Sequence, residues 1–124
     1  MINSLTTLTL VVGRIFLSVF ILLSGVTKIA RNKMMVEYAM SKKLPMPGAA
    51  IALAVLIELA GGISVLTGFH ARVAAAILIV YLIPTTLIFH NFWAAAGAEK
   101  QNQGVHFMKN VAIMGGLLIL ASIA

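Results

Sequence analysis

The sequence contains no cysteine, which excludes disulfide bonds and thiol chemistry. Charged residues are also scarce, at 10% of the 124 residues, against roughly 25% in an ordinary soluble domain. Hydrophobic residues make up 61% of the chain, and the mean hydropathy is +1.07. The composition therefore predicts a protein that is built for a lipid bilayer rather than for water.

The motifs of soluble enzymes are absent as well. The sequence holds no nucleophile elbow, no phosphate-binding loop and no dinucleotide fingerprint. The paired glycines that begin at Gly61 and Gly115 lie inside apolar stretches, where close helix packing accounts for them. No catalytic residue can be assigned from the sequence.

Acidic residues are outnumbered by Lys and Arg, three to nine, which gives a formal net charge of +6. A basic chain can bind nucleic acid, but here most of the cations cluster in loops that flank apolar stretches. Anionic lipid head groups are the nearer partner in that position. We therefore expect contact with the lipid bilayer and no nucleic acid partner.

Four apolar stretches follow one another, at about residues 5–27, 48–67, 71–90 and 105–124. Each approaches the ~20 residues that a helix needs to cross a bilayer, and a helix satisfies its backbone polar groups internally. The sequence predicts an all-α membrane protein, a four-transmembrane-helix bundle that forms one domain over residues 1–124. The last stretch is long enough only if its helix begins near Val105.

The first stretch differs from a cleavable signal peptide. Residues 1–9 contain no Lys or Arg, and no small-x-small cleavage site follows the apolar core. We therefore expect this stretch to remain in the protein as its first span.

Basic residues are distributed unevenly between the two predicted sides of the membrane. The two longer connections share one side and carry five cations: Arg31, Lys33, Lys42, Lys43 and Lys100. The other side holds both termini and the short turn at 68–70, with Arg72 near its edge. The positive-inside rule then places the long loops in the cytoplasm and both termini outside. We expect a multi-pass protein of the cell membrane, most simply of a bacterial inner membrane.

The first long connection, residues 31–47, allows two interpretations. Met34, Met35, Met40 and Tyr38 stand among several cations, a composition that suits a short interfacial helix ended by two prolines. A solvated basic loop is equally compatible, because the apolar positions form no clean stripe.

Two charged residues, Arg14 and Glu58, lie inside the apolar stretches, where lipid disfavours an unpaired charge. Counted along two antiparallel helices at about 1.5 Å per residue, both come about 13 Å below the same membrane face. We predict that they form a buried ion pair. Such a pair either fixes the helix register or lines a polar pocket inside the bundle.

Polar and aromatic residues gather toward the predicted cytoplasmic end. The candidate ligand-binding residues are Lys28, Glu58, His90, Phe92, Trp93, His106, Lys109 and Asn110. His106, Lys109 and Asn110 are spaced i, i+3 and i+4, so they share one helix face. His90, His106 and Glu58 are a weak set of metal ligands, because no close carboxylate or cysteine spacing accompanies them. We therefore expect no metal site.

Five segments are spread along nearly the whole chain: "GRIFLSVFILLSGVTKI" (13–29), "LPMPG" (44–48), "ELAGGISVLTGFHARVAA" (58–75), "FHNFW" (89–93) and "HFMKNVAIMGGLL" (106–118). In order and spacing they resemble the DoxX family of small four-helix membrane proteins. By position, the resemblance marks Arg14, Ser24, Gly25, Lys28, Glu58, Gly61, Gly62, Gly68, Arg72, His90, Phe92, Trp93, His106, Lys109, Asn110, Gly115 and Gly116.

The resemblance implies a link to membrane redox metabolism and to oxidative-stress partners. The family is named for a subunit associated with a quinone-reducing, sulfur-oxidising complex, and most members have no assigned reaction. The resemblance therefore implies that this chain is an accessory subunit of a quinone-linked oxidoreductase, with no catalytic motif of its own.

The leading hypothesis is a redox-associated subunit that binds a quinone or another polar-headed lipid at the cytoplasmic mouth of the bundle. The polar candidates would hydrogen-bond the head, Lys109 would supply positive potential, and Phe92 and Trp93 would pack the ring. The chain has no electron carrier, so redox turnover requires a redox partner protein or a bound cofactor.

The alternative is a non-catalytic scaffold whose basic loops dock a soluble partner. It assigns the docking to Lys42 and Lys43 and gives His90 and His106 no part in it. A transporter is less well supported, because four short helices without an inverted repeat make a small pathway unless the protein forms a homo-oligomer. Small-residue faces would allow such an oligomer, although internal packing uses the same residues.

Overall fold

A computed structural model describes residues 3–124, which are mostly helical and contain no strand. The elements, in order, are α1 (Ser4–Ala30), α2 (Asn32–Ser41), α3 (Pro47–Thr67), α4 (Ala71–Phe89), the 3-10 helix η1 (Phe92–Ala94) and α5 (Gly97–Ile123). Within these residues, four helices are long and apolar enough to cross a membrane: α1, α3, α4 and α5. The predicted all-α membrane fold with four spans is confirmed.

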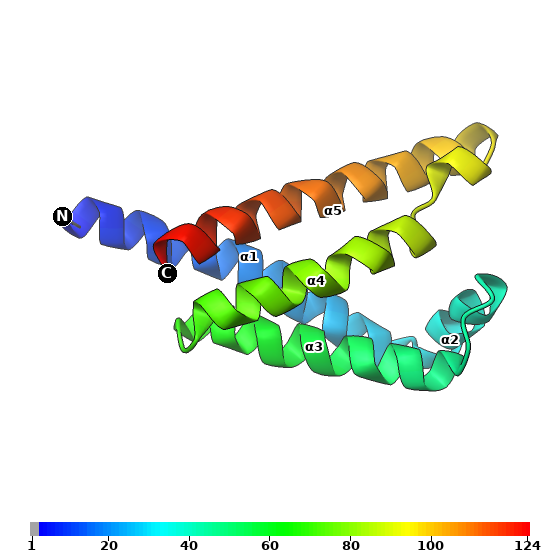
Figure 1. Ribbon diagram of the computed structural model, residues 1–124, viewed down its shortest axis with the longest axis horizontal. Coiled ribbons are helices and arrows are strands. Elements are labelled where there is room, and N and C mark those ends of the chain that lie inside the picture. Colours follow the sequence, from blue (N-terminus) through cyan, green and yellow to red (C-terminus); the bar gives the residue numbers. More distant parts are fainter. Residues whose placement is uncertain (1–2) are drawn as a thin grey trace.

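The four long helices form an antiparallel bundle. Helix α1 packs against α3, α3 against α4, and α4 against α5, while the short α2 packs on α3. Figure 1 shows the start of α1, the end of α5 and the α3–α4 turn at one end of the bundle. Helix α2 and η1 lie at the opposite end (Figure 1). The two long connections therefore share one end, as the alternation of four spans requires.

Local signals set the helix boundaries. The side chain of Asn3 caps α1 by accepting a hydrogen bond from the Thr6 N–H at 2.8 Å. Helix α3 starts with Pro47 at its first position, where a missing N–H costs nothing. It ends at Gly68, whose φ of +82° is the left-handed conformation that glycine adopts most readily at a helix end. This sharp stop sends the chain directly into α4.

Two connections contain more helix than hydropathy indicates. Helix α5 begins at Gly97 rather than near Val105, because its first turns are polar yet still favour a helix. The Gln103 side chain donates to Glu99 Oε1 at 2.8 Å, one turn away, and supports these turns. Residues 32–41 form α2, so the helical interpretation of the first long connection is correct.

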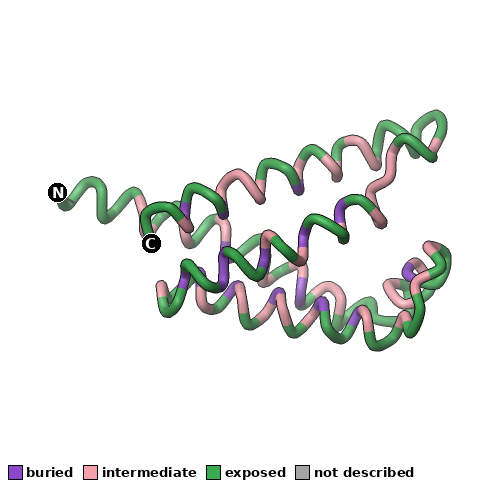
Figure 2. Tube along the Cα trace, viewed as in Figure 1, coloured by how far each residue is buried: buried purple, intermediate pink, exposed green. Residues whose placement is uncertain are grey.

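The outer faces of the long helices are apolar and exposed. Figure 2 shows the buried residues on the inward sides of the helices and exposed residues along the outer sides. Phe16 is 74% exposed and Val80 is 70% exposed, although both are strongly apolar. Water would disfavour such a surface, whereas lipid tails solvate it. The protein therefore contacts the bilayer with these faces.

Glycines let α1 and α3 approach closely. A Cβ on Gly25 would lie 2.9 Å from Leu59 Cδ2, and one on Gly62 would lie 2.7 Å from Leu22 Cδ2. Small residues at a helix contact allow this close approach in lipid. These contacts align Gly25 with the Glu58–Leu59 step and thereby define the register of the two helices.

Candidate functional site

A buried acid joins three helices. Glu58 on α3 is 5% exposed, and Lys28 Nζ on α1 lies 3.1 Å from each of its carboxylate oxygens. The Tyr81 hydroxyl on α4 donates to Glu58 Oε2 at 2.8 Å, and Lys28 also donates to Ser24 Oγ at 2.8 Å. The Glu58 carboxylate therefore has both an opposite charge and hydrogen-bond donors beside it, and a carboxylate inside a membrane bundle requires both.

The predicted ion pair between Arg14 and Glu58 is wrong, because Lys28 is the partner of Glu58. Arg14 lies instead beside the end of α3, where its Nη1 is 2.6 Å from the position that a Gly68 Cβ would take. The depth count assumed that the start of α1 and the end of α3 lie at the same level, whereas α1 extends past the α3–α4 turn (Figure 1). The contacts of Gly25 and Gly62 show that α1 is shifted along α3 by about eleven residues from the assumed register, roughly 17 Å.

A second polar group forms where α4, α5 and α1 come together. The rings of His90 and His106 stack with centroids 5.1 Å apart, and Lys109 Nζ lies 3.4 Å from His106 Nδ1. Lys109 Nζ also lies 5.0 Å from the ring centroid of Phe20, in a cation–π contact. Among residues 3–124, no group of three or more His, Asp or Glu side chains could hold a metal ion.

Asn110 shares a helix face with these residues but makes a different contact. It is buried, and its Nδ2 donates to Thr86 Oγ1 on α4 at 3.0 Å. Thr86 is fully buried as well. The pair holds α5 against α4, so one donor of Asn110 is already used within the protein.

The two polar groups form one electrostatic region. His90 lies close enough to Lys28 and Lys109 for both charges to act on it. The charge of Glu58 in turn acts on Lys109. A single carboxylate therefore faces two ammonium groups and two imidazoles, which leaves a positive potential suited to a carbonyl or anionic head group.

A hydrogen-bond network closes the end of the bundle next to these residues. Gln103 contacts His90 Nδ1 at 2.8 Å and donates to the Tyr38 hydroxyl at 3.4 Å and to Glu99. Tyr38 on α2 donates to the Phe89 carbonyl at 2.5 Å. Burial and the negative charge of Glu99 raise the pKa of Tyr38, so the hydroxyl stays a donor at neutral pH. The network fixes the ring of His90 and joins α2 to α4 and α5.

Helix α2 has a second link to this end. Lys42 Nζ donates to Asn91 Oδ1 at 2.7 Å and lies 5.4 Å from the Tyr38 ring centroid. Lys43, Arg31 and Lys33 are exposed. Lys42 therefore has a structural partner, while its basic neighbours point outward.

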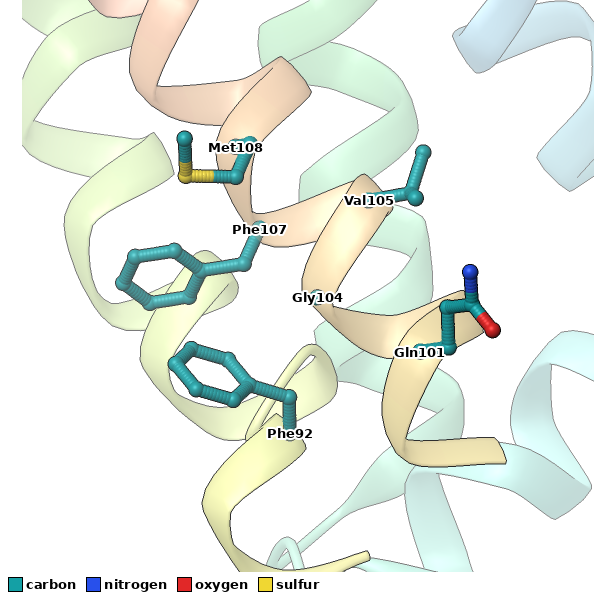
Figure 3. A pocket seen from close by; sticks show the side chains of 6 residues that line it. All are labelled: Phe92, Gln101, Gly104, Val105, Phe107 and Met108. Carbon is teal, nitrogen blue, oxygen red and sulfur yellow. The ribbon is translucent and has the colours of Figure 1, made fainter. Parts of the chain in front are cut away.

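Phe92 and Trp93 lie in an aromatic cluster beside α5. The centroid of Phe92 is 5.3 Å from that of Trp93 and 5.2 Å from that of Phe107, both edge-to-face. Phe92, Phe107 and Met108 (Figure 3) line a hollow whose volume is about 470 Å³. Among residues 3–124, the ring contacts of Phe92 and Trp93 run to each other and to Phe107, not to the histidines.

A longer groove of about 910 Å³ runs between α1 and α5. Its lining is mainly apolar, with Phe16 and Leu17 on one side and Ile113 on the other. Two cations belong to this lining, Lys109 and Arg14. Since Lys109 also contacts His106, the groove leads from the lipid-facing surface to the polar region.

Several site residues escaped the sequence prediction. They are Tyr38, Tyr81, Thr86 and Gln103. Tyr81 carried a signal, because a tyrosine in the middle of an apolar span needs a partner for its hydroxyl. Gln103 carried none, since it lies in a segment that hydropathy assigns to a loop.

Comparison with known proteins supports a family assignment. The sequence model of the DoxX family matches residues 9–91. The chain is similar to inner membrane protein YphA of Escherichia coli (strain K12), with 32% identity over 112 residues, 90% of this chain and 80% of that protein. It is also similar to inner membrane protein YqjF of the same organism, with 32% identity over 110 residues, 89% of this chain and 79% of that protein. No solved structure matches the chain.

Proposed function

Because the chain belongs to the DoxX family of integral membrane proteins, we propose that it is a redox-associated membrane subunit that binds a quinone or a similar polar-headed lipid. The observation that carries this proposal is the apolar α1–α5 groove, whose lining includes Lys109 at one end, with His106 in contact with Lys109. The two relatives are named as inner membrane proteins, and we extend that location to this chain. The long loops then lie in the cytoplasm and both termini outside.

The residues at this end of the groove fit a quinone head. Lys109 offers an ammonium donor, and His106 offers a ring nitrogen on the same helix face. The stacked His90 ring, held by Gln103, limits the movement of His106. A bound quinone would supply the electron acceptor that the side chains of this protein lack.

The groove fits the tail of such a lipid. Apolar residues of α1 and α5 line it over several helical turns, from Phe20 down to Leu5 on α1. An isoprenoid or acyl tail can pack along this surface by van der Waals contact, because both are apolar. The Lys28–Glu58 pair compensates its own charges, so Lys109 supplies the positive potential toward the head.

The first test is mass spectrometry of lipids extracted from gently purified protein, against a detergent-matched control. Wild type should retain a quinone above the control, and His106→Ala should retain about tenfold less because a head-group hydrogen bond is lost. His70→Asn is the matched control, because His70 is exposed and lies on the α3–α4 turn at the other end of the bundle.

The proposal fails if no quinone or polar-headed lipid is enriched in any sample. It also fails if His106→Ala and His70→Asn retain the same amount as wild type. Glu58→Gln serves as a second variant, because it should perturb the polar region without removing a proposed head-group donor.

The exposed cations around α2 favour a second function, docking of a soluble partner protein by a scaffold. Lys43, Arg31 and Lys33 all face outward. This function requires that Lys33→Gln and Lys43→Gln together abolish co-purification of a cytoplasmic protein, while His106→Ala leaves it unchanged. The reverse pattern in a pull-down would eliminate the scaffold.

A further inference from the structure

Arg14 is the charged residue whose environment the polar cluster does not explain. Its Nε is fully buried and has no hydrogen-bond partner within the described part of the chain. Among residues 3–124, no carboxylate lies within ion-pair distance of its guanidinium. Glu58, the partner predicted from the sequence, pairs with Lys28 instead. Arg14 as a whole is half-buried, but a charged guanidinium with a buried, unpartnered N–H and no anion is costly, and in membrane proteins such a group is a candidate binding site.

The position of Arg14 along the bundle identifies the depth of that partner. Helix α3 has 21 residues, about 31 Å at 1.5 Å per residue, which matches the ~30 Å of a hydrocarbon core. Its end at Gly68 therefore lies near the level of the lipid phosphates. The guanidinium of Arg14 lies beside Gly68, so it is at that level too.

The backbone beside Arg14 leaves room for the guanidinium. Any Cβ at Gly68 would approach Arg14 Nη1 to 2.6 Å. The absence of a side chain there lets Arg14 lie against the C-terminal end of α3, whose carbonyls attract a cation. That contact orients the guanidinium but supplies no countercharge.

We propose that Arg14 binds the phosphate of an anionic glycerophospholipid, whose acyl chain enters the α1–α5 groove beside Gly13, Phe16 and Leu17. The charge is complementary, and the guanidinium can hold a phosphate through two parallel hydrogen bonds. A lipid fits better than a free anion, because the groove that Arg14 lines is apolar. The phosphate would lie toward the opposite end of the groove from His106 and Lys109, although the acyl chain and a quinone tail would share the apolar lining between them.

The test is a titration of purified protein in neutral detergent, with native mass spectrometry counting bound lipid. Wild type should bind phosphatidylglycerol about tenfold more tightly than phosphatidylcholine, and Arg14→Gln should lose that preference. Arg72→Gln is the matched control. Arg72 lies on the neighbouring turn of the same end, but its Nη2 already donates to the Ala124 carbonyl.

Further experiments distinguish a lipid phosphate from free phosphate, and the Arg14 site from the His106–Lys109 site. Inorganic phosphate alone should not displace phosphatidylglycerol; displacement by millimolar phosphate would overturn the lipid assignment. His106→Ala should keep the preference for phosphatidylglycerol, even if its quinone content changes. Loss of the preference in Arg72→Gln and Arg14→Gln alike would reduce the effect to general surface charge and overturn the proposal.

A variant that keeps the cation covers the case in which Arg14→Gln does not fold. Arg14→Lys should retain a weaker preference, because an ammonium cannot make the paired contacts of a guanidinium. Equal binding of both lipids by wild-type protein would by itself overturn the proposal. An equal loss of thermal stability in both lipids on Arg14→Gln, with unchanged binding, would assign Arg14 to helix capping and overturn it as well.

Discussion

Among single residues, Glu58 has the most constrained surroundings. Its carboxylate accepts from Lys28 and Tyr81, and it is nearly inaccessible. Removing one member of a buried ion pair leaves the other charge uncompensated, whereas removing both members leaves no buried charge without a partner. The interaction between Lys28 and Glu58 should therefore be visible as a coupling energy.

We predict that Lys28→Met and Glu58→Gln are coupled by about 1–3 kcal/mol in a double-mutant cycle. Arg14→Met and Glu58→Gln should be additive to within about 0.5 kcal/mol, because Arg14 lies near the end of α3 and not beside Glu58. Reversible unfolding in mixed micelles, followed by the fluorescence of the single tryptophan, measures both cycles. Strong coupling of Arg14 instead of Lys28 would contradict the register described above.

Gly68 and Gly13 provide a matched pair of glycines. Gly68→Ala should destabilise the protein by about 1–2 kcal/mol, because its φ of +82° disfavours a Cβ and Arg14 occupies the space. A Cβ on Gly13 would meet nothing within 4 Å, and Gly13 is helical, so Gly13→Ala should stabilise by about 0.4–1 kcal/mol. Thermal unfolding of both variants in one detergent checks the signs. Equal shifts would contradict the contact between Arg14 and the end of α3.

At the scale of helices, the α1–α3 contact depends on small residues at its centre. Gly62→Val should cost about 1–3 kcal/mol, because a Cβ there would lie 2.7 Å from Leu22 Cδ2 and push α1 away. Gly115→Val is the control, since a Cβ on Gly115 would meet nothing within 4 Å. Unfolding in micelles measures both. A larger loss for Gly115→Val would indicate that the outer face of α5 packs against a second copy.

Helix α2 is joined to the rest of the bundle end by the hydroxyl of Tyr38. Tyr38→Phe keeps the ring beside Phe89, with centroids 5.5 Å apart, but removes the donor to the Phe89 carbonyl. The loss of about 1 kcal/mol should raise amide exchange in α2 roughly fivefold. Hydrogen exchange with mass spectrometry follows this, with the exposed Met40→Gln as control. Unchanged exchange in Tyr38→Phe would mean that packing on α3 alone holds α2.

These helices also show what a sequence can predict here. The number and type of spans follow from hydropathy, because lipid imposes a length and an apolar surface on each helix. The start of α5 does not follow, since Glu99 and Gln103 are polar and continue the helix outside the apolar stretch. The candidates Glu58 and Lys28 were recognisable as charges within or next to apolar stretches. Their pairing was not, because it depends on a register that the contacts of Gly25 and Gly62 define.

For the molecule as a whole, the arrangement in the membrane combines two observations of different kinds. The bundle places α2 and η1 at one end and the α3–α4 turn at the other (Figure 1). The cations Arg31, Lys33 and Lys43 are exposed at the α2 end. The positive-inside rule therefore favours a cytoplasmic location for that end.

The sidedness can be measured without interference, because the natural chain contains no cysteine. Single cysteines at three exposed positions, Phe69→Cys, Lys43→Cys and Gln101→Cys, each report one connection. In intact cells a membrane-impermeant maleimide should label Phe69→Cys only, because the proposed orientation places the other two in the cytoplasm. Opening the membrane should then make all three reactive. Labelling of Lys43→Cys and Gln101→Cys alone would invert the orientation, and labelling of Phe69→Cys together with Lys43→Cys would contradict an odd number of crossings between them.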